Sequence, residues 1–95
     1  MKEEDKRDTN KRIKKIREIS GLTRDEFATK VGIKSSQLAN IEHEKQFAPS
    51  WMIQSISKEY KEYGYWLGTG ETIESAGQIS PDIEESRRNL KTGTH

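Results

Sequence analysis

The residues that first suggest chemistry are polar but uncharged, and they lie together in the middle of the chain. The run from residue 34 to residue 40 reads KSSQLAN, and its hydrogen-bonding side chains are Ser35, Ser36, Gln37 and Asn40. Hydroxyl and amide groups both donate and accept hydrogen bonds, whereas a helix surface usually carries charges. A merely solvated face is the simplest interpretation of these residues, and the surrounding sequence must decide whether they do more.

Residues that would carry catalysis or hold a metal ion are not arranged for it. Ser55 and Lys58 have the spacing of a lysine-activated serine, but nothing nearby suggests an oxyanion hole. The glycines of YGYWLGTG are not followed by the Lys-Ser/Thr pair that completes a phosphate-binding loop. Two histidines without any cysteine are a poor ligand set for structural zinc. We therefore predict no enzyme activity, no cofactor and no metal site.

Length and composition restrict the fold to one small domain. The chain has 95 residues, of which 29% are apolar and 35% are charged. A core this small suits a helical bundle better than a sandwich of sheets. The lack of cysteine fits a reducing cytosol. The opening MKEEDKRDTNKR has no apolar signal segment, and no run approaches the roughly 20 apolar residues of a membrane span.

The charges are nearly balanced but unevenly distributed along the chain. The net charge is +1, with an excess of Lys and Arg in residues 1–20 and an excess of Asp and Glu in residues 71–95. The residues between them are balanced. This distribution is far from the strong basic bias of a protein that binds DNA through electrostatics alone.

Local patterns predict the first two helices. Residues 1–9 are polar and mixed in charge, so we expect a flexible arm there. Isoleucines that recur every three residues from Ile13 form an apolar stripe, which predicts a first helix from about residue 10. Thr23 and Glu26 have the spacing of a capping box, in which each side chain bonds the other residue's backbone amide. Gly32 supplies the left-handed residue that ends this second helix.

Three more helices complete the expected domain. The third spans about 34–42, with Leu38 and Ile41 directed inward. Pro49 suits the first turn of a fourth helix that runs to about Tyr60. The segment YGYWLGTG forms a short fifth helix that ends in glycines. The aromatic residues around the last two helices suit a core or a dimer surface better than base stacking: Trp51, Tyr65 and Trp66.

Residues 72–95 form a tail that we expect to be partly disordered. The triplet Ser80-Pro81-Asp82 is typical of a helix start and favours a short helix over 81–90, which would be marginal in isolation. Ile79, Ile83 and Leu90 line one face of the tail and offer a surface for docking on a partner subunit.

Residue types at fixed offsets between Arg24 and Ile41 fit two helices joined by a tight turn. Steeply crossing helices need a small residue where they meet, here Ala28, and the turn needs a residue with positive φ, here Gly32. Apolar residues occupy the positions that hold such a corner together: Phe27, Val31, Ile33, Leu38 and Ile41.

This pattern resembles the Cro/repressor-type (lambda repressor-like, XRE-type) helix-turn-helix family of phages and bacteria. The likeness rests on GLTRDEFATKVGIKSSQLANIEHEK, on the fourth helix that starts at a proline, and on the closing YWLGTGE. It implies an all-α, compact five-helix domain over residues 10–71. It also implies a cytoplasmic protein of a bacterial or phage-host cell that binds double-stranded operator DNA, usually as a homodimer on a near-palindrome.

The resemblance further implies roles for individual residues. The third helix becomes the recognition helix in the major groove, with these base-contacting residues: Ser35, Ser36, Gln37 and Asn40. The implied phosphate contacts surround it: Arg24, Lys34, His43, Lys45 and Gln46. Lys11 or Lys14 would add to them, although a solvated face is the simpler interpretation of both.

Three positions depart from the family's pattern. Lys34 occupies a position where a capping hydroxyl is common, so Ser35 is an alternative cap that would then not read a base. Glu44 takes a place often held by glycine. Glu42 and Glu44 together would bring negative charge to the DNA side, where phosphate repels it.

The resemblance favours a sequence-specific DNA-binding regulator of transcription, such as a repressor. One alternative is a DNA-binding antitoxin whose tail, residues 72–95, binds a toxin. From another class, a protein-interaction adapter that no longer reads DNA is favoured by the weak net charge and by the two glutamates. We expect no membrane association and no small-molecule ligand.

Overall fold

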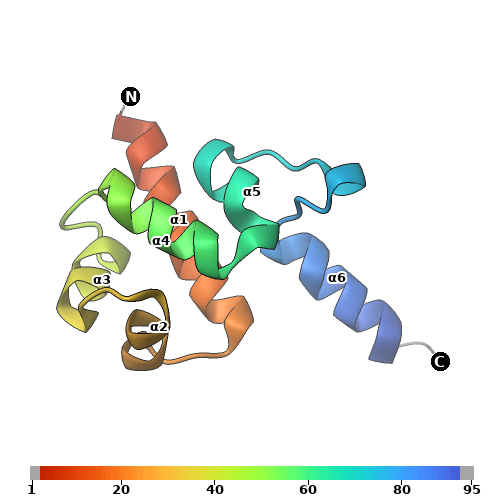
Figure 1. Cartoon of the computed structure of the whole chain (residues 1–95), viewed down its shortest axis with the longest axis horizontal. Helices are drawn as coiled ribbons and strands as arrows, with labels where there is room; N and C mark the ends of the chain where they lie inside the picture. Colours follow the sequence, from red (N-terminus) through yellow and green to blue (C-terminus); the bar gives the residue numbers. More distant parts are fainter. Residues whose placement is uncertain (1–2, 93–95) are drawn as a thin grey trace.

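Residues 3–92, which the computed structural model describes, contain six α-helices and two short 3-10 turns joined by loops (Figure 1). The helices are α1 (Glu3–Ser20), α2 (Arg24–Val31), α3 (Ser35–Glu42), α4 (Ser50–Glu59), α5 (Gly64–Thr69) and α6 (Pro81–Thr92). The 3-10 turns are η1 (Lys61–Tyr63) and η2 (Glu74–Ala76). The long α1 contacts α3, α5 and α6, and α2 packs on α3 and α4. The all-α class is confirmed, with one helix more than the five of the expected domain because the tail contributes α6.

Each of the first five helices contributes an apolar face to one core. Its fully buried side chains include Ile13, Ile16, Phe27, Leu38, Ile41, Met52, Ile56 and Leu67. The aromatic rings of Phe27, Tyr60 and Tyr63 continue this core, with centroid distances of 5.6 and 6.3 Å between neighbours. Burying one such side chain contributes roughly 1.5–3 kcal/mol, so packing supplies most of the stability of these short helices.

Helix α1 starts earlier than its polar sequence indicated. It begins at Glu3, so the arm expected over residues 1–9 is helical from Glu3 onward, and residues 1 and 2 lie outside the described range. Thr9 and Asn10 are buried at 4% and 1% exposed. The Thr9 hydroxyl donates to a backbone carbonyl one turn earlier, at 2.9 Å. Because these buried residues are polar, apolar periodicity does not reveal the first turns of the helix.

The tail folds back on the domain. Ile79 is 4% exposed, and its backbone N–H donates to the Glu62 carbonyl at 2.9 Å. The tail that we expected to be partly disordered is therefore anchored on the domain at Ile79 and continues as a helix to Thr92, while residues 93–95 lie outside the described range. The helix expected over 81–90 corresponds to α6. Ile79 belongs to this chain's own core and is not open to a partner subunit, whereas Leu90 is 71% exposed.

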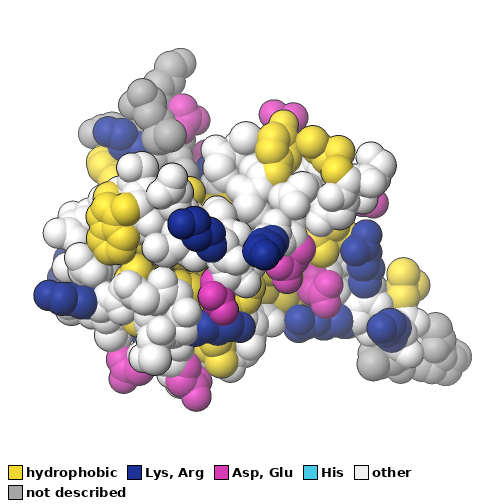
Figure 2. All heavy atoms as spheres, viewed as in Figure 1, with side chains coloured by type: hydrophobic (Ala, Val, Ile, Leu, Met, Phe, Trp, Pro, Cys, Tyr) yellow, Lys and Arg dark blue, Asp and Glu magenta, His cyan; other side chains and the backbone are white. Residues whose placement is uncertain are grey.

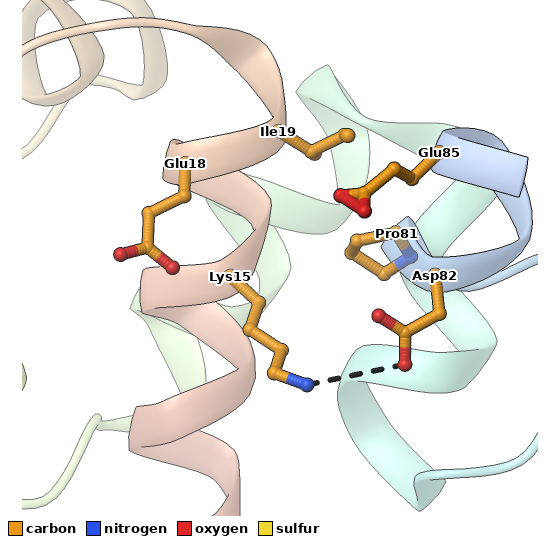
Figure 3. A pocket seen from close by; sticks show the side chains of 6 residues that line it. All are labelled: Lys15, Glu18, Ile19, Pro81, Asp82 and Glu85. Carbon is orange, nitrogen blue, oxygen red and sulfur yellow. Dashed lines mark ion pairs between the residues drawn. The ribbon is translucent and has the colours of Figure 1, made fainter. Parts of the chain in front are cut away.

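Polar contacts hold α6 on α1 beside a cleft of about 210 Å³ (Figure 3). Arg88 Nη1 donates to the Ile19 carbonyl at 3.1 Å, and Lys15 Nζ lies 3.9 Å from the Asp82 carboxylate. Figure 3 shows the Lys15 and Asp82 side chains pointing toward each other, with Glu18 turned away from α6. Exposed ion pairs contribute only about 0–1 kcal/mol, so these contacts orient α6 more than they stabilise it.

Residues 3–92 contain neither a membrane-spanning helix nor a cluster of metal ligands. None of the helices there is long and apolar enough to cross a membrane. Within the same range, no group of three or more His, Cys, Asp or Glu side chains is placed to hold a metal ion. The polar residues around α2 and α3 remain the main candidates for a functional site.

Candidate nucleic-acid interface

The two helices of the predicted corner are closed as their sequence indicates. The Glu26 N–H donates to Thr23 Oγ1 at 3.2 Å, and the Thr23 N–H donates to Glu26 Oε1 at 2.9 Å, which confirms the capping box. Gly32 ends α2 at φ 78°, and its N–H donates to the Ala28 carbonyl at 2.9 Å. Ala28 is 2% exposed, so the small residue lies buried as the crossing of α2 and α3 requires.

The start of α3 is fixed by side chains that we predicted to contact bases. Lys34 is the N-cap residue, and its backbone N–H donates to Gln37 Oε1 at 3.2 Å. Ser35 does not cap the helix in its place; its hydroxyl donates to the carboxylate of Asp25 at the start of α2. The alternative cap at Ser35 was therefore wrong. Two of the four candidate base contacts already have partners within the protein.

Ser36 and Asn40 differ from these two residues. Within the described residues, neither side chain has a hydrogen-bond partner, and Ser36 is exposed while Asn40 is half-buried. They stand four residues apart on α3 and therefore share one face of the helix. The hydrogen-bonding capacity of this face is open to an external partner.

Behind that face, Glu42 lies between two arginines. Its Oε2 is 2.6 Å from Arg17 Nε, and its Oε1 is 2.9 Å from Arg17 Nη2 and 3.0 Å from Arg24 Nε. Burial alone would raise the pKa of Glu42, but the hydrogen bonds and charges of Arg17 and Arg24 outweigh it and hold the pKa below its ordinary value. The hydrogen bond to Glu42 raises the pKa of Arg17.

This arrangement corrects the expectation that Glu42 repels phosphate. Its carboxylate is fully buried and carries two cationic partners, so it adds no unbalanced negative charge to the DNA side. The sequence interpretation missed Arg17, which stands directly after Ile16 at the edge of the apolar stripe. The position of Arg17 beside the buried isoleucine stripe was the one sequence feature that could have indicated an internal ion pair.

Two predicted phosphate contacts meet at one end of the corner. Arg24 Nη2 lies 3.2 Å from His43 Nε2, so the first residue of α2 and the residue after α3 form one polar site. The side chain of Arg24 is 37% exposed, and its Nε is held by Glu42. The ion pair thus orients Arg24 without removing it from solvent.

Glu44 closes α3 in a conformation that usually needs glycine. Its φ is 57°, and in the described residues it is the one non-glycine residue with positive φ. The Lys45 N–H donates to the Asn40 carbonyl at 2.8 Å and the Glu44 N–H to the Ile41 carbonyl at 3.1 Å. These two bonds form a Schellman motif, which satisfies the last carbonyls of the helix. The exposed Lys45 and Gln46 follow directly in the loop toward α4.

Basic side chains do not gather into a strong patch on the face that Figure 2 presents. The figure shows Lys and Arg side chains interspersed with Asp and Glu, in agreement with the net charge of +1. Because the net charge of the chain is only +1, binding of nucleic acid would depend on the placement of single residues more than on a broad positive field.

A helix-turn-helix domain family model matches residues 10–73. The chain belongs to this family. The match covers the α2–α3 corner and supports the resemblance to Cro/repressor-type proteins. A comparison with curated proteins found no match.

Membership in the helix-turn-helix family makes this chain a DNA-binding domain. The four predicted base contacts are all on α3, and four of the predicted phosphate contacts border it: Lys34 and His43 at its two ends, Lys45 and Gln46 in the next loop. Arg24, the fifth, comes from the start of α2 and reaches His43. Lys11 and Lys14 belong to α1. Their individual contacts with DNA stay predictions.

Proposed function

We propose that this protein is a sequence-specific regulator of transcription, Cro- or repressor-like, that places α3 in the major groove of double-stranded DNA. The observation that carries the proposal is the face of Ser36 and Asn40, because their hydrogen-bonding groups have no partner within the described residues. They lie on the second helix of the corner, the helix that contacts bases in helix-turn-helix proteins.

Asn40 is the main base-reading residue in this proposal. A carboxamide pairs bidentately with the N6 and N7 atoms of adenine, so Asn40 would select an adenine in the half-site. Gln37 retains its Nε2 donors, because only its Oε1 accepts the Lys34 N–H. The Ser36 hydroxyl can donate or accept and therefore discriminates less.

Phosphate contacts would fix the register of α3 in the groove. Arg24 and His43 form one contact site at the α2 start, and Lys34 forms another at the α3 start. Lys45 and Gln46 lie beyond the other end of α3. Contacts spread over both ends of a recognition helix fix its orientation without contributing to base selection.

We further propose a homodimer on a near-palindromic operator. Three large side chains around the α3–α4 loop, α4 and α5 are exposed and offer apolar surface to a second copy: Phe47 at 40%, Trp51 at 45% and Tyr65 at 39%. Two copies would read half-sites separated by about one helical turn, 34–36 Å. Light scattering of the free protein and of its complex with a selected duplex tests this arrangement.

The two alternative functions have lost part of their support. The buried ion pair of Glu42 removes one of the glutamates that favoured an adapter without DNA binding. The packing of Ile79 into the core removes part of the tail surface that an antitoxin would offer to a toxin. Two exposed residues still support the alternatives: Glu44 the adapter, and Leu90 in the tail the antitoxin.

Selection from a pool of random duplexes at moderate salt tests the regulator proposal directly. We expect enrichment of a near-palindromic site, with an affinity that falls steeply as salt rises and a preference over unrelated duplexes that persists. Failure to enrich any site would overturn the proposal, and a lack of salt-dependent binding to unrelated duplexes as well would favour the adapter.

A further inference from the structure

Asn10 connects the first helix to the loop that follows the recognition helix. Its Nδ2 donates to the Gln46 carbonyl at 2.8 Å, and its Oδ1 accepts the Ala48 N–H at 3.2 Å. The side chain is 1% exposed, and its partners lie 36 and 38 residues further along the chain. One carboxamide thus satisfies both a carbonyl and an amide of the loop.

This pairing needs the chemistry of a carboxamide. Among side chains of this length, only asparagine presents a donor and an acceptor in one plane, as the two loop groups require. A buried carbonyl or N–H that loses its partner is costly, so the loop backbone has a strong reason to stay on Asn10. A second contact lies beside it, where Lys6 Nζ sits 5.3 Å from the centre of the Phe47 ring.

The ends of the loop are fixed by other means. The Schellman motif at Glu44 sets the direction in which the chain leaves α3, and Pro49 is the N-cap residue of α4. Between these points, the bonds to Gln46 and Ala48 hold the loop against α1. Lys45 and Gln46 are two of the predicted phosphate contacts. The Lys45 N–H belongs to the Schellman motif, and the Gln46 carbonyl is one of the two groups that Asn10 holds.

We propose that Asn10 is a positioning residue for DNA binding, which holds the α3–α4 loop where Lys45 and Gln46 reach the phosphates beside the recognition helix. The inference rests on the proposed function and names a residue on α1 that does not itself contact DNA. It also assigns a role to the start of α1. Lys6 belongs to the segment that we expected to be an arm, and Asn10 directly follows that segment.

The test compares Asn10→Ala with a variant that weakens the fold elsewhere. Ile83→Ala is the matched control, because Ile83 packs against the core from α6 and is remote in sequence from the corner and the loop. Binding is measured over a range of salt concentrations, at a temperature where circular dichroism shows both variants folded. Competing unrelated duplexes and a repeat of the random-duplex selection give the base preferences.

We expect Asn10→Ala to bind selected and unrelated duplexes about ten-fold more weakly, with unchanged base preferences. The slope of log affinity against log salt should become shallower by about one, the change expected when one phosphate contact is lost. Ile83→Ala should keep the slope of the original protein. In the Lys45→Ala, Gln46→Ala background, Asn10→Ala should change the slope no further, since it acts through these residues.

One further measurement and one replacement variant keep the test decisive. Hydrogen exchange at the Ala48 amide should accelerate in Asn10→Ala more than exchange at core amides does, because the loop opens locally. If Asn10→Ala does not fold, Asn10→Ser takes its place, because its uncharged hydroxyl can bond at most one of the two loop groups at a time. A slope equal to that of Ile83→Ala would overturn the inference while leaving the regulator proposal intact. If the original protein enriches no site, the proposed function itself fails.

Discussion

Arg17 and Glu42 face each other across α1 and α3 with two hydrogen bonds, from Nε to Oε2 at 2.6 Å and from Nη2 to Oε1 at 2.9 Å. The paired geometry connects α1, the longest helix of the domain, to the last residue of α3. Glu42 also accepts from Arg24, so one buried carboxylate orients groups on α1 and α2 relative to α3. The position of the candidate DNA face therefore depends on a charge inside the protein.

Replacing Glu42 by glutamine should destabilise the fold strongly. The substitution leaves two cations next to a neutral amide, and breaking one side of a buried ion pair costs about 3 kcal/mol or more. Glu84→Gln is the matched control, because it breaks a more exposed pair with Arg88 whose loss costs about 0.5 kcal/mol. Urea unfolding at neutral pH measures both. Equal losses in the two variants would contradict a structural role for Glu42.

The same carboxylate predicts a dependence of stability on pH. Because the pKa of Glu42 is lower in the folded than in the unfolded state, the unfolded chain takes up the proton first as pH falls. The stabilisation is complete well above pH about 4.3, the ordinary value for glutamate, and is lost as pH falls through the folded pKa. Between pH 7 and pH 3, the free energy of unfolding measured with urea should therefore fall less for Glu42→Gln than for the original protein. Parallel losses would exclude this contribution.

The features of the fold that could be predicted from the sequence are those formed by residues close together in the chain. The isoleucine stripe of α1, the capping box at Thr23 and the turn at Gly32 each involve residues only a few positions apart, and all three are present. The place of glycine after α3 was also recognisable, and the structure gives Glu44 the positive φ that a glycine would take there.

The contacts that sequence reasoning missed join residues that are distant in the chain. Arg17 and Glu42 are 25 positions apart, and Asn10 and Gln46 are 36 apart. No local spacing indicates which buried cation meets which buried carboxylate, or which loop carbonyl meets an asparagine. For the same reason, the hydrogen bond from Ser35 to Asp25, ten positions earlier in the chain, was not predicted.

Replacing Glu44 by glycine should stabilise the protein. A non-glycine residue in the left-handed region, such as Glu44, costs roughly 1–2 kcal/mol of stability. Glycine removes this strain but loses more conformational entropy on folding, so we expect a net gain of about 0.5–1 kcal/mol. Glu44→Ala should show no such gain, because alanine keeps the strain. Thermal unfolding distinguishes the two variants, and equal midpoints would contradict the backbone explanation.

The same two variants separate strain from charge in DNA binding. Both remove an exposed carboxylate close to Lys45 and Gln46, so both should bind DNA more tightly at low salt, with the difference shrinking as salt rises. Fluorescence anisotropy with a selected duplex measures the change. If only Glu44→Gly gained affinity, the loop conformation would be the cause and the repulsion of phosphate would not.

Asn40 and Arg24 provide the clearest separation of base reading from backbone binding. Asn40→Ala should cost about 1–3 kcal/mol on the selected site and relax the preference at one base pair of each half-site, because its carboxamide has no partner in the described residues and is free to bond a base. Arg24→Ala should weaken selected and unrelated duplexes alike and make the salt dependence shallower, since its guanidinium lies by the expected phosphate contact of His43. Competition with duplexes changed one base pair at a time measures both effects. A uniform loss for Asn40→Ala would show that α3 does not use this residue to read bases, and would turn attention to Ser36 and Gln37.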